Sequence, residues 1–329
     1  MSEKNIINIK SVGLFTEGII DYAGLFPPAE LDLKTAFSNY MEYLSGDNSY
    51  ILSGFICPVK LLPELEVICN EISEFKFPVK ISLILSGGKD EITFKENLIS
   101  DLKVRENFLT GINSFIRADN FEYKIPESFM TEENNERLLD LFGFISQNLK
   151  NGSDSKFTFF AETSLTGDWK KNIKTAADLI EEHNETFQDT GFKLRTGGVT
   201  AAAIPTAEQI AFAVRHCLNR NLEMKFTAGL HHPFRHFDKN VNAKMHGFIN
   251  IFSAGIIAKR HNISDHEMIK LLEDENPDNF KFTESGFSWG GYEIENEDIH
   301  FARQTFVKSY GSCSFDEPVD DLKKLNLII

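Results

Sequence analysis

Short apolar runs alternate with longer amphipathic ones along most of the chain. Apolar and β-branched runs predict eight strands, at residues 18–24, 50–59, 79–85, 111–118, 157–162, 192–196, 224–228 and 307–315. Apolar positions at helical spacing predict helices between them, including residues 33–44, 61–72, 132–149, 168–183, 207–219 and 245–260. Regular alternation of this kind is typical of parallel βαβ units, and eight strands predict a single closed (β/α)8 barrel of the TIM type.

The region between the last two predicted strands is longer than a minimal barrel needs. We expect an insertion at about residues 234–306, with further helices at 264–275 and 296–307. Residues 282–294, which contain three glycines, resemble a small hairpin; the alternative places the eighth barrel strand there instead. Because no linker-like or low-complexity segment marks a boundary, we expect one domain over residues 1–329 with an enlarged loop between strands seven and eight.

Composition narrows the class of protein. The chain has 329 residues, 42% of them hydrophobic and 25% charged, and 34 basic against 49 acidic residues give a net charge of −15. An acidic field with no basic tract repels phosphate backbones, which argues against a nucleic-acid partner. The N-terminus lacks an apolar leader, and the longest nearly uncharged apolar stretch is too short to span a bilayer. Four widely spaced cysteines indicate free thiols, so we expect a cytoplasmic protein with no membrane partner and leave a homo-oligomer open.

Polar residues lie where the predicted strands end. Asp21 belongs to the end of the first strand, Arg117 and Asp119 belong to the end of the fourth, and Glu162 ends the fifth. In a barrel the carboxyl ends of the strands meet at one face, where active sites are built. We therefore expect these side chains to share one cavity.

Two lysines lie in the sixth and seventh predicted strands, near their carboxyl ends. Lys193 and Lys225 are 32 residues apart, and strand alternation places Arg195 on the same face as Lys193. Adjacent parallel strands would direct both ammonium groups into the barrel, where a neighbouring cation can lower a lysine pKa. The alternatives are salt bridges to Glu162 or Asp119, or a lysine that holds an anionic substrate.

The last three strand ends together resemble a known family. The matching positions are Lys193, Thr196 and Gly197, then Lys225, Ala228 and Gly229, then Gly311, Ser312 and Ser314. In this order they are similar to the strand ends of class I aldolases of the deoxyribose-phosphate aldolase type. The resemblance implies that Lys193 forms an imine with the substrate, that Lys225 is the second ammonium, that Asp119 is the acid/base partner, and that the third segment is a phosphate loop.

Several residues depart from that pattern. Arg195 adds a positive charge, and Asp316 and Glu317 would repel a phosphate after the last strand. The segment HHPFRHFD adds His231, His232, Arg235 and His236 after the seventh strand. These imidazoles could bind substrate, hold a divalent metal together with Glu162 and Asp119, or serve structure alone. Cys313 has acidic neighbours, which favours a packed thiol over a nucleophile.

These observations predict a Schiff-base-forming, aldolase-like lyase that acts on a small carbonyl compound without a cofactor. A metal-dependent sugar isomerase or hydrolase and a non-catalytic protein that binds small acids are the alternatives. The predicted catalytic residues are Lys193, Lys225, Asp119 and Glu162. The predicted substrate-binding residues are Asp21, Arg117, Arg195, Gly197, Gly198, Gly229, His231, His232, Arg235, Gly311, Ser312 and Ser314.

Overall fold

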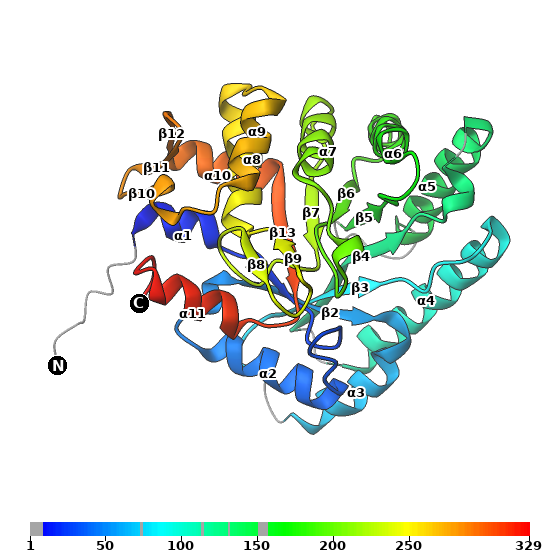
Figure 1. Cartoon of the computed structure of the whole chain (residues 1–329). Helices are drawn as coiled ribbons and strands as arrows, with labels where there is room; N and C mark the ends of the chain where they lie inside the picture. Colours follow the sequence, from blue (N-terminus) through cyan, green and yellow to red (C-terminus); the bar gives the residue numbers. More distant parts are fainter. Residues whose placement is uncertain (1–8, 73–74, 113–114, 131, 151–156) are drawn as a thin grey trace.

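The computed structural model describes residues 9–72, 75–112, 115–130, 132–150 and 157–329. Eight parallel strands close into a barrel (Figure 1). In order around the barrel they are β1 (Ile20–Tyr22), β13 (Val307–Ser312), β7 (Met224–Thr227), β6 (Thr190–Arg195), β5 (Thr158–Glu162), β4 (Ile116–Lys124), β3 (Val79–Ile84) and β2 (Leu52–Pro58). The predicted TIM-type barrel is confirmed.

A helix follows each barrel strand. These helices are α2 (Leu33–Ser45), α3 (Leu62–Glu71), α4 (Glu91–Gly111), α5 (Asn135–Lys150), α6 (Trp169–Asn184), α7 (Ala207–Asn219), α8 (Phe248–His261) and α11 (Asp316–Lys324), and α1 (Lys10–Thr16) precedes β1. Local sequence fixes several helix starts. Asp32, Asp90 and Asp168 accept backbone N–H groups at the starts of α2, α4 and α6, and Thr206 forms a capping box with Gln209.

The region between β7 and β13 contains two small sheets besides α8. Its other elements are β8 (His236–Asp238), β9 (Ala243–Met245), α9 (Asp265–Glu273), β10 (Lys281–Phe282), β11 (Gly286–Trp289), β12 (Tyr292–Glu295) and α10 (Asn296–Thr305). Residues 282–294 do form a hairpin, β11–β12, with β10 as a third antiparallel strand. The eighth barrel strand is β13, so the alternative that placed it at 282–294 is wrong.

The fourth strand differs most from its prediction. Expected at residues 111–118, of which 113 and 114 lie outside the described residues, it runs instead from Ile116 to Lys124. Residue 111 ends α4, a helix absent from the predicted set. Apolar residues are spread around α4, and two of them, Ile92 and Ile99, are 72% and 53% exposed. The helix therefore lacks the clear apolar stripe by which an amphipathic helix is identified.

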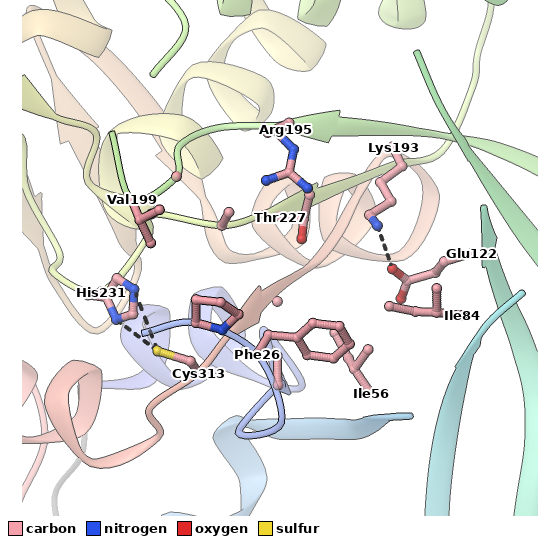
Figure 2. A pocket seen from close by; sticks show the side chains of 16 residues that line it. Phe26, Ile56, Ile84, Glu122, Lys193, Arg195, Val199, Thr227, His231 and Cys313 are labelled. Carbon is pink, nitrogen blue, oxygen red and sulfur yellow. Dashed lines mark hydrogen bonds and ion pairs between the residues drawn. The ribbon is translucent and has the colours of Figure 1, made fainter. Parts of the chain in front are cut away.

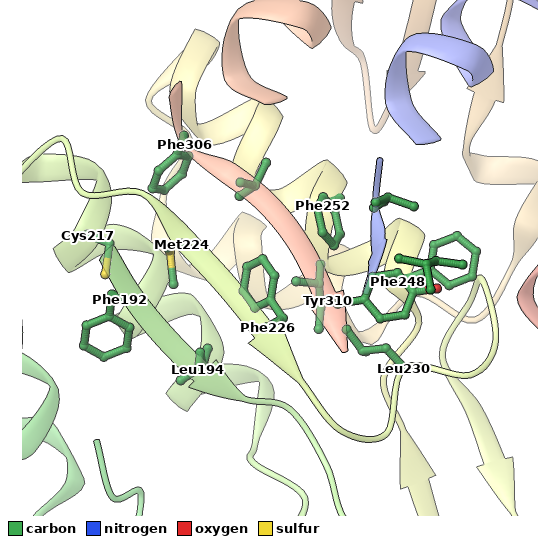
Figure 3. Close-up of a cluster of buried hydrophobic side chains, with 14 of the residues drawn as sticks. Phe192, Leu194, Cys217, Met224, Phe226, Leu230, Phe248, Phe252, Phe306 and Tyr310 are labelled. Atoms are coloured by element: carbon green, nitrogen blue, oxygen red, sulfur yellow. The ribbon is translucent and has the colours of Figure 1, made fainter. Parts of the chain in front are cut away.

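Outward-facing side chains of β6, β7 and β13 pack against α7 and α8 (Figure 3). The ring centroids of Phe226 and Phe252 are 5.3 Å apart, and Phe248 stacks on Tyr310 at 5.4 Å. Since successive side chains of a strand alternate between faces, burying Phe226 in this layer directs the preceding residue, Lys225, into the barrel. The apolar layer thus sets the direction of the charged residues.

In the described part of the chain, no helix combines the length and the apolar character that crossing a membrane requires.

We predict that Phe226→Ala lowers the free energy of unfolding by about 3–5 kcal/mol, because it leaves a cavity between β7 and α8. Phe237, which is 49% exposed, provides the control, since Phe237→Ala removes the same ring from the surface. Chemical denaturation followed by circular dichroism measures both. Equal losses for the two variants would contradict the packing described here.

Candidate active site

Three carboxylates and three cations from five strands meet inside the barrel. The carboxylates belong to Asp21 (β1), Glu122 (β4) and Glu162 (β5), and the cations to Lys193 and Arg195 (β6) and Lys225 (β7). Register explains the meeting: Lys193 is directly opposite Glu162 on one side and Lys225 on the other. Formal charge within the group is balanced.

Lys193 is bonded to two carboxylates. Its Nζ lies 2.9 Å from Glu122 Oε2 and 3.0 Å from Glu162 Oε2, and its side chain is 7% exposed. Glu162 also accepts from Nε of Arg195 at 3.1 Å through its other oxygen. Glu162 therefore lies between the two cations of β6.

Lys225 lies deeper, with 2% of its side chain exposed. Its Nζ is 3.0 Å from Asp21 Oδ2 and also contacts Oε1 of Glu122. Ser82 and the Lys225 ammonium both contact that Glu122 oxygen, with the Ser82 hydroxyl donating at 2.7 Å. Glu122 is thus a bridge whose two oxygens join the two lysines.

The carboxylates hold both lysines as ammonium ions. Burial by itself would lower the pKa of Lys193, but Glu122 and Glu162 outweigh it, and the pKa is raised. Burial would likewise lower the pKa of Lys225, but the carboxylates of Asp21 and Glu122 outweigh it, and this pKa is also raised. Burial would raise the pKa of Glu122, but Lys225 and Lys193 hold it well below its usual range. The resting site is therefore a network of ion pairs. Neither lysine has the lowered pKa that a neighbouring cation was expected to produce.

A cavity of about 250 Å³ opens onto this network from the carboxyl face (Figure 2). Lys193 and Glu122 line it, whereas Lys225 and Asp21 lie behind them. The other lining residues are Ala23, Phe26, Pro27, Ile56, Ile84, Arg195, Gly198, Val199, Thr227, Ala228, Gly229, His231, Gly311 and Cys313. Of the two buried lysines, Lys193 is the one a ligand in this cavity can reach.

Two glycines allow the loops after β6 and β7 to touch. A Cβ on Gly197 would lie 2.8 Å from Cα of Gly229, and Gly229 has a φ of +77°. The hydroxyl of Thr196 lies 2.8 Å from the carbonyl oxygen of Ala228 and joins the same two loops. The predicted Lys-x-x-Thr-Gly segment therefore fixes the backbone around the cavity.

The predicted partner Asp119 and the predicted binding residue Arg117 lie away from this cavity. Asp119 forms a salt bridge with Arg105 of α4 at 3.0 Å. Arg117 is exposed near the start of β4, and is thus at the opposite end of the barrel. Both expectations are corrected for the same reason: the strand begins about five residues later than expected, so the fourth-strand carboxylate inside the barrel is that of Glu122.

Sequence reasoning missed Glu122, although a signal for it was present. Phe121 and Tyr123 are both buried, and Tyr123 packs its ring against Phe94 and Phe142 on the helix side. Two aromatic residues flanking a carboxylate indicate a strand with that carboxylate on the inner face.

The histidine segment divides between the cavity and the surface. His231 lines the cavity, and its Nδ1 lies 3.0 Å from Glu317 of α11. His232 is 2.5 Å from Asp321 of α11, and Arg235 is 3.2 Å from His246, so neither borders this cavity. His231 and His232 pair with carboxylates of α11, and the described residues include no group of three or more His, Cys, Asp or Glu side chains arranged to hold a metal ion.

The segment predicted to bind phosphate forms its own turn. Gly311 lines the cavity, but the hydroxyl of Ser312 donates to the carbonyl of Ser314 at 2.6 Å. The hydroxyl of Ser314 in turn accepts the backbone N–H of Glu317 at 3.1 Å. Cys313 also lines the cavity, and burial raises the pKa of its thiol to about 11, so it is a neutral thiol near neutral pH.

We predict that the network makes the free energy of unfolding fall as the pH is lowered into the acid range. Ion pairs depress the pKa of Glu122 and Glu162 in the fold, so the unfolded chain binds protons first as pH falls below about 4.5. The stabilisation is present above that pH and is lost progressively below it. Glu122→Gln should cost about 3–5 kcal/mol at pH 7, because it leaves buried ammonium groups short of a carboxylate, and should flatten the acid dependence.

Urea denaturation at several pH values between 7 and 3 tests this expectation. Glu182→Gln, on the exposed surface of α6, removes one charge and is the matched control. An unchanged acid dependence in Glu122→Gln would contradict the assigned network.

Comparisons with known proteins find similarity only at the level of structure. No family model matches the sequence, and no curated protein matches it. One similar solved structure is described as "QR15, an Aldolase"; it is 12% identical with a TM-score of 0.43, over 64% of this chain and 80% of that one. Another is the deoxyribose phosphate aldolase from Aeropyrum pernix, described as having a unique tetrameric structure; it is 11% identical with a TM-score of 0.44, over 69% of this chain and 86% of that one. The chain therefore has a distant structural similarity to aldolases, and its chemistry has to be argued from its own site.

Proposed function

We propose that the protein is a lyase of the class I aldolase kind, which forms an imine between Lys193 and a small carbonyl compound. The observation that carries the proposal is the position of Lys193. It lies at the boundary between an ion-pair network and a small cavity, with two carboxylates within 3.0 Å of its Nζ. An amine that attacks a carbonyl needs bases that take and return its protons.

Glu162 is the proposed acceptor of the first proton. It contacts Lys193 but not Lys225, whereas Glu122 is held ionised by both ammonium groups and Ser82. With the proton on Glu162, the free amine attacks the carbonyl carbon. The C–N bond forms as the C=O π bond breaks, and one N–H proton passes from the nitrogen to the oxygen to give a neutral carbinolamine. The carbinolamine then loses its hydroxyl as water, using a proton from the same carboxyl group. The resulting iminium ion withdraws electrons from the adjacent carbon, which allows a C–C bond to break or form.

Lys225 has a supporting role in this scheme. It neutralises Glu122 and Asp21, so Lys193 does not face the whole negative charge of the network. Removing Lys225 would raise the pKa of Lys193, because Glu122 would then pair with Lys193 alone. The metal-dependent alternative lacks support, since Asp119 and the imidazoles that it needs are bonded to other residues.

Borohydride reduction in the presence of small aldehydes and ketones should trap a substrate fragment on Lys193, as identified by mass spectrometry of peptides. We expect Lys193→Met to abolish trapping and Lys225→Met to slow it, because a higher pKa of Lys193 leaves a smaller fraction of free amine. Lys60→Met, at an exposed position, is the matched control. A folded protein that gives no adduct with any carbonyl would refute the imine and leave a binding protein.

The rate of imine formation should rise with pH, because loss of the Lys193 proton to solvent adds free amine to the fraction, independent of pH, that transfer to Glu162 supplies. The pKa of Lys193 is raised above 10.5, so the fraction of free amine still increases throughout the range from pH 7 to 10. Aliquots incubated at each pH and quenched with borohydride under one common condition measure this dependence. A rate that stays constant from pH 7 to 10 would contradict loss of the proton to solvent, and would leave either transfer to Glu162 alone or a lowered pKa of Lys193.

A further inference from the structure

We propose that the substrate is a short 2-oxo acid, or an aldol adduct of one, whose carboxylate is bound by Arg195 while its carbonyl carbon meets Lys193. The inference rests on the proposed function, because it places the acid beside the amine that forms the imine. It names the substrate class from the walls of the cavity.

Arg195 has hydrogen-bond donors to spare. Its Nε donates to Glu162. Among the residues that the structure describes, no other side chain forms a hydrogen bond or ion pair with this guanidinium. A guanidinium has five N–H donors, so its two Nη atoms remain to bind an oxyanion. The side chain is 47% exposed, against 7% for Glu162, and it lines the cavity. In Figure 2 its guanidinium lies between Lys193 and Val199 on the same side of the cavity.

The spacing of Arg195 and Lys193 suits adjacent functional groups. Both residues are on the inner face of β6, two positions apart, and both contact the carboxylate of Glu162. Residues two apart on a strand are separated by roughly 7 Å along the backbone, and their side chains converge on Glu162. A carboxylate bonded directly to the reacting carbonyl carbon would keep the substrate on both cations at once. A planar, two-oxygen group also matches the fork of a guanidinium.

The opposite end of the cavity does not favour a phosphate. Ser312 and Ser314 are bonded within their own turn. The first turn of α11 carries Asp316 and Glu317, and Glu317 is paired with His231. A doubly charged phosphate would meet these carboxylates without a cation dedicated to it, whereas a singly charged carboxylate at Arg195 lies on the other side.

The remaining wall of the cavity is apolar, and the cavity is small. Phe26, Ile56 and Ile84 line the cavity on the side away from Arg195 (Figure 2). The cavity holds about 250 Å³, below the range usual for drug-sized ligands. The tail of the acid is therefore short and aliphatic.

Pyruvate and its uncharged isostere pyruvamide test the inference, because they differ in the carboxylate alone. Borohydride trapping under competition should favour pyruvate by roughly 10- to 100-fold, the range expected for hydrogen bonds to a charged group. Arg195→Gln should bring this ratio close to one, and Arg195→Lys should retain part of it, because lysine lacks the fork. Arg260→Gln, which removes an exposed arginine elsewhere, should retain the wild-type ratio.

The outcomes separate this inference from the proposed function. Trapping of both compounds in a ratio near one in the wild type, or preferential trapping of glyceraldehyde 3-phosphate, overturns the carboxylate site and leaves the imine standing. If no compound is trapped, the imine fails, and calorimetric titration with pyruvate decides the carboxylate site alone. Binding that Arg195→Gln weakens at least tenfold supports the site; no binding, or binding that the substitution does not change, overturns it. Circular dichroism establishes that each variant is folded, and Arg195→Lys decides if Arg195→Gln is not.

Discussion

The balance of charge around Glu122 is the interaction on which the interior of the barrel depends. An unpaired ion in such a place is costly, and each of the two buried lysines would be unacceptable alone. Glu122 accepts from both through different oxygens, while Asp21 and Glu162 complete the pairing on either side. The charged residues come from five strands, so they can pair with one another only when the barrel is closed.

The same balance defines the chemical problem that the site has to solve. Because the network keeps Lys193 as an ammonium ion, Lys193 is a poor nucleophile at rest. In the proposed reaction its proton has to move before the free amine can attack. A carbonyl compound would contact Lys193 within a cavity whose far wall is apolar. The proton on Lys193 thus stabilises the ion-pair network, whereas the proposed imine formation needs that proton removed.

Alternation along the strands accounts for most of what the sequence could predict. Lys193 and Lys225 face inward because their neighbours Phe192, Leu194 and Phe226 are buried under helices, and this pattern is visible in six or seven letters of sequence. Capping residues and glycines likewise act through local geometry, which is why α7 and the turns beside Gly197 and Gly229 follow from the sequence. The fourth strand did not, because its polar residues are tolerated only by a closed barrel, and α4 shows no single apolar stripe. The partner of a buried charge depends on tertiary structure, so Glu122 could be recognised only once its strand was placed.

The contact between Gly197 and Gly229 has a consequence for how such a site could change. Because the loops after β6 and β7 meet backbone to backbone, the separation of the two lysines is set by main-chain atoms and not by the side chains of the cavity wall. The apolar residues of the cavity wall, among them Val199, Phe26 and Ile84, belong to other positions. Substitutions there would reshape the cavity and leave the two lysines where they are. The charged centre and the apolar wall are therefore separate parts of the cavity, and one scaffold could accommodate differently shaped ligands by changes to that wall.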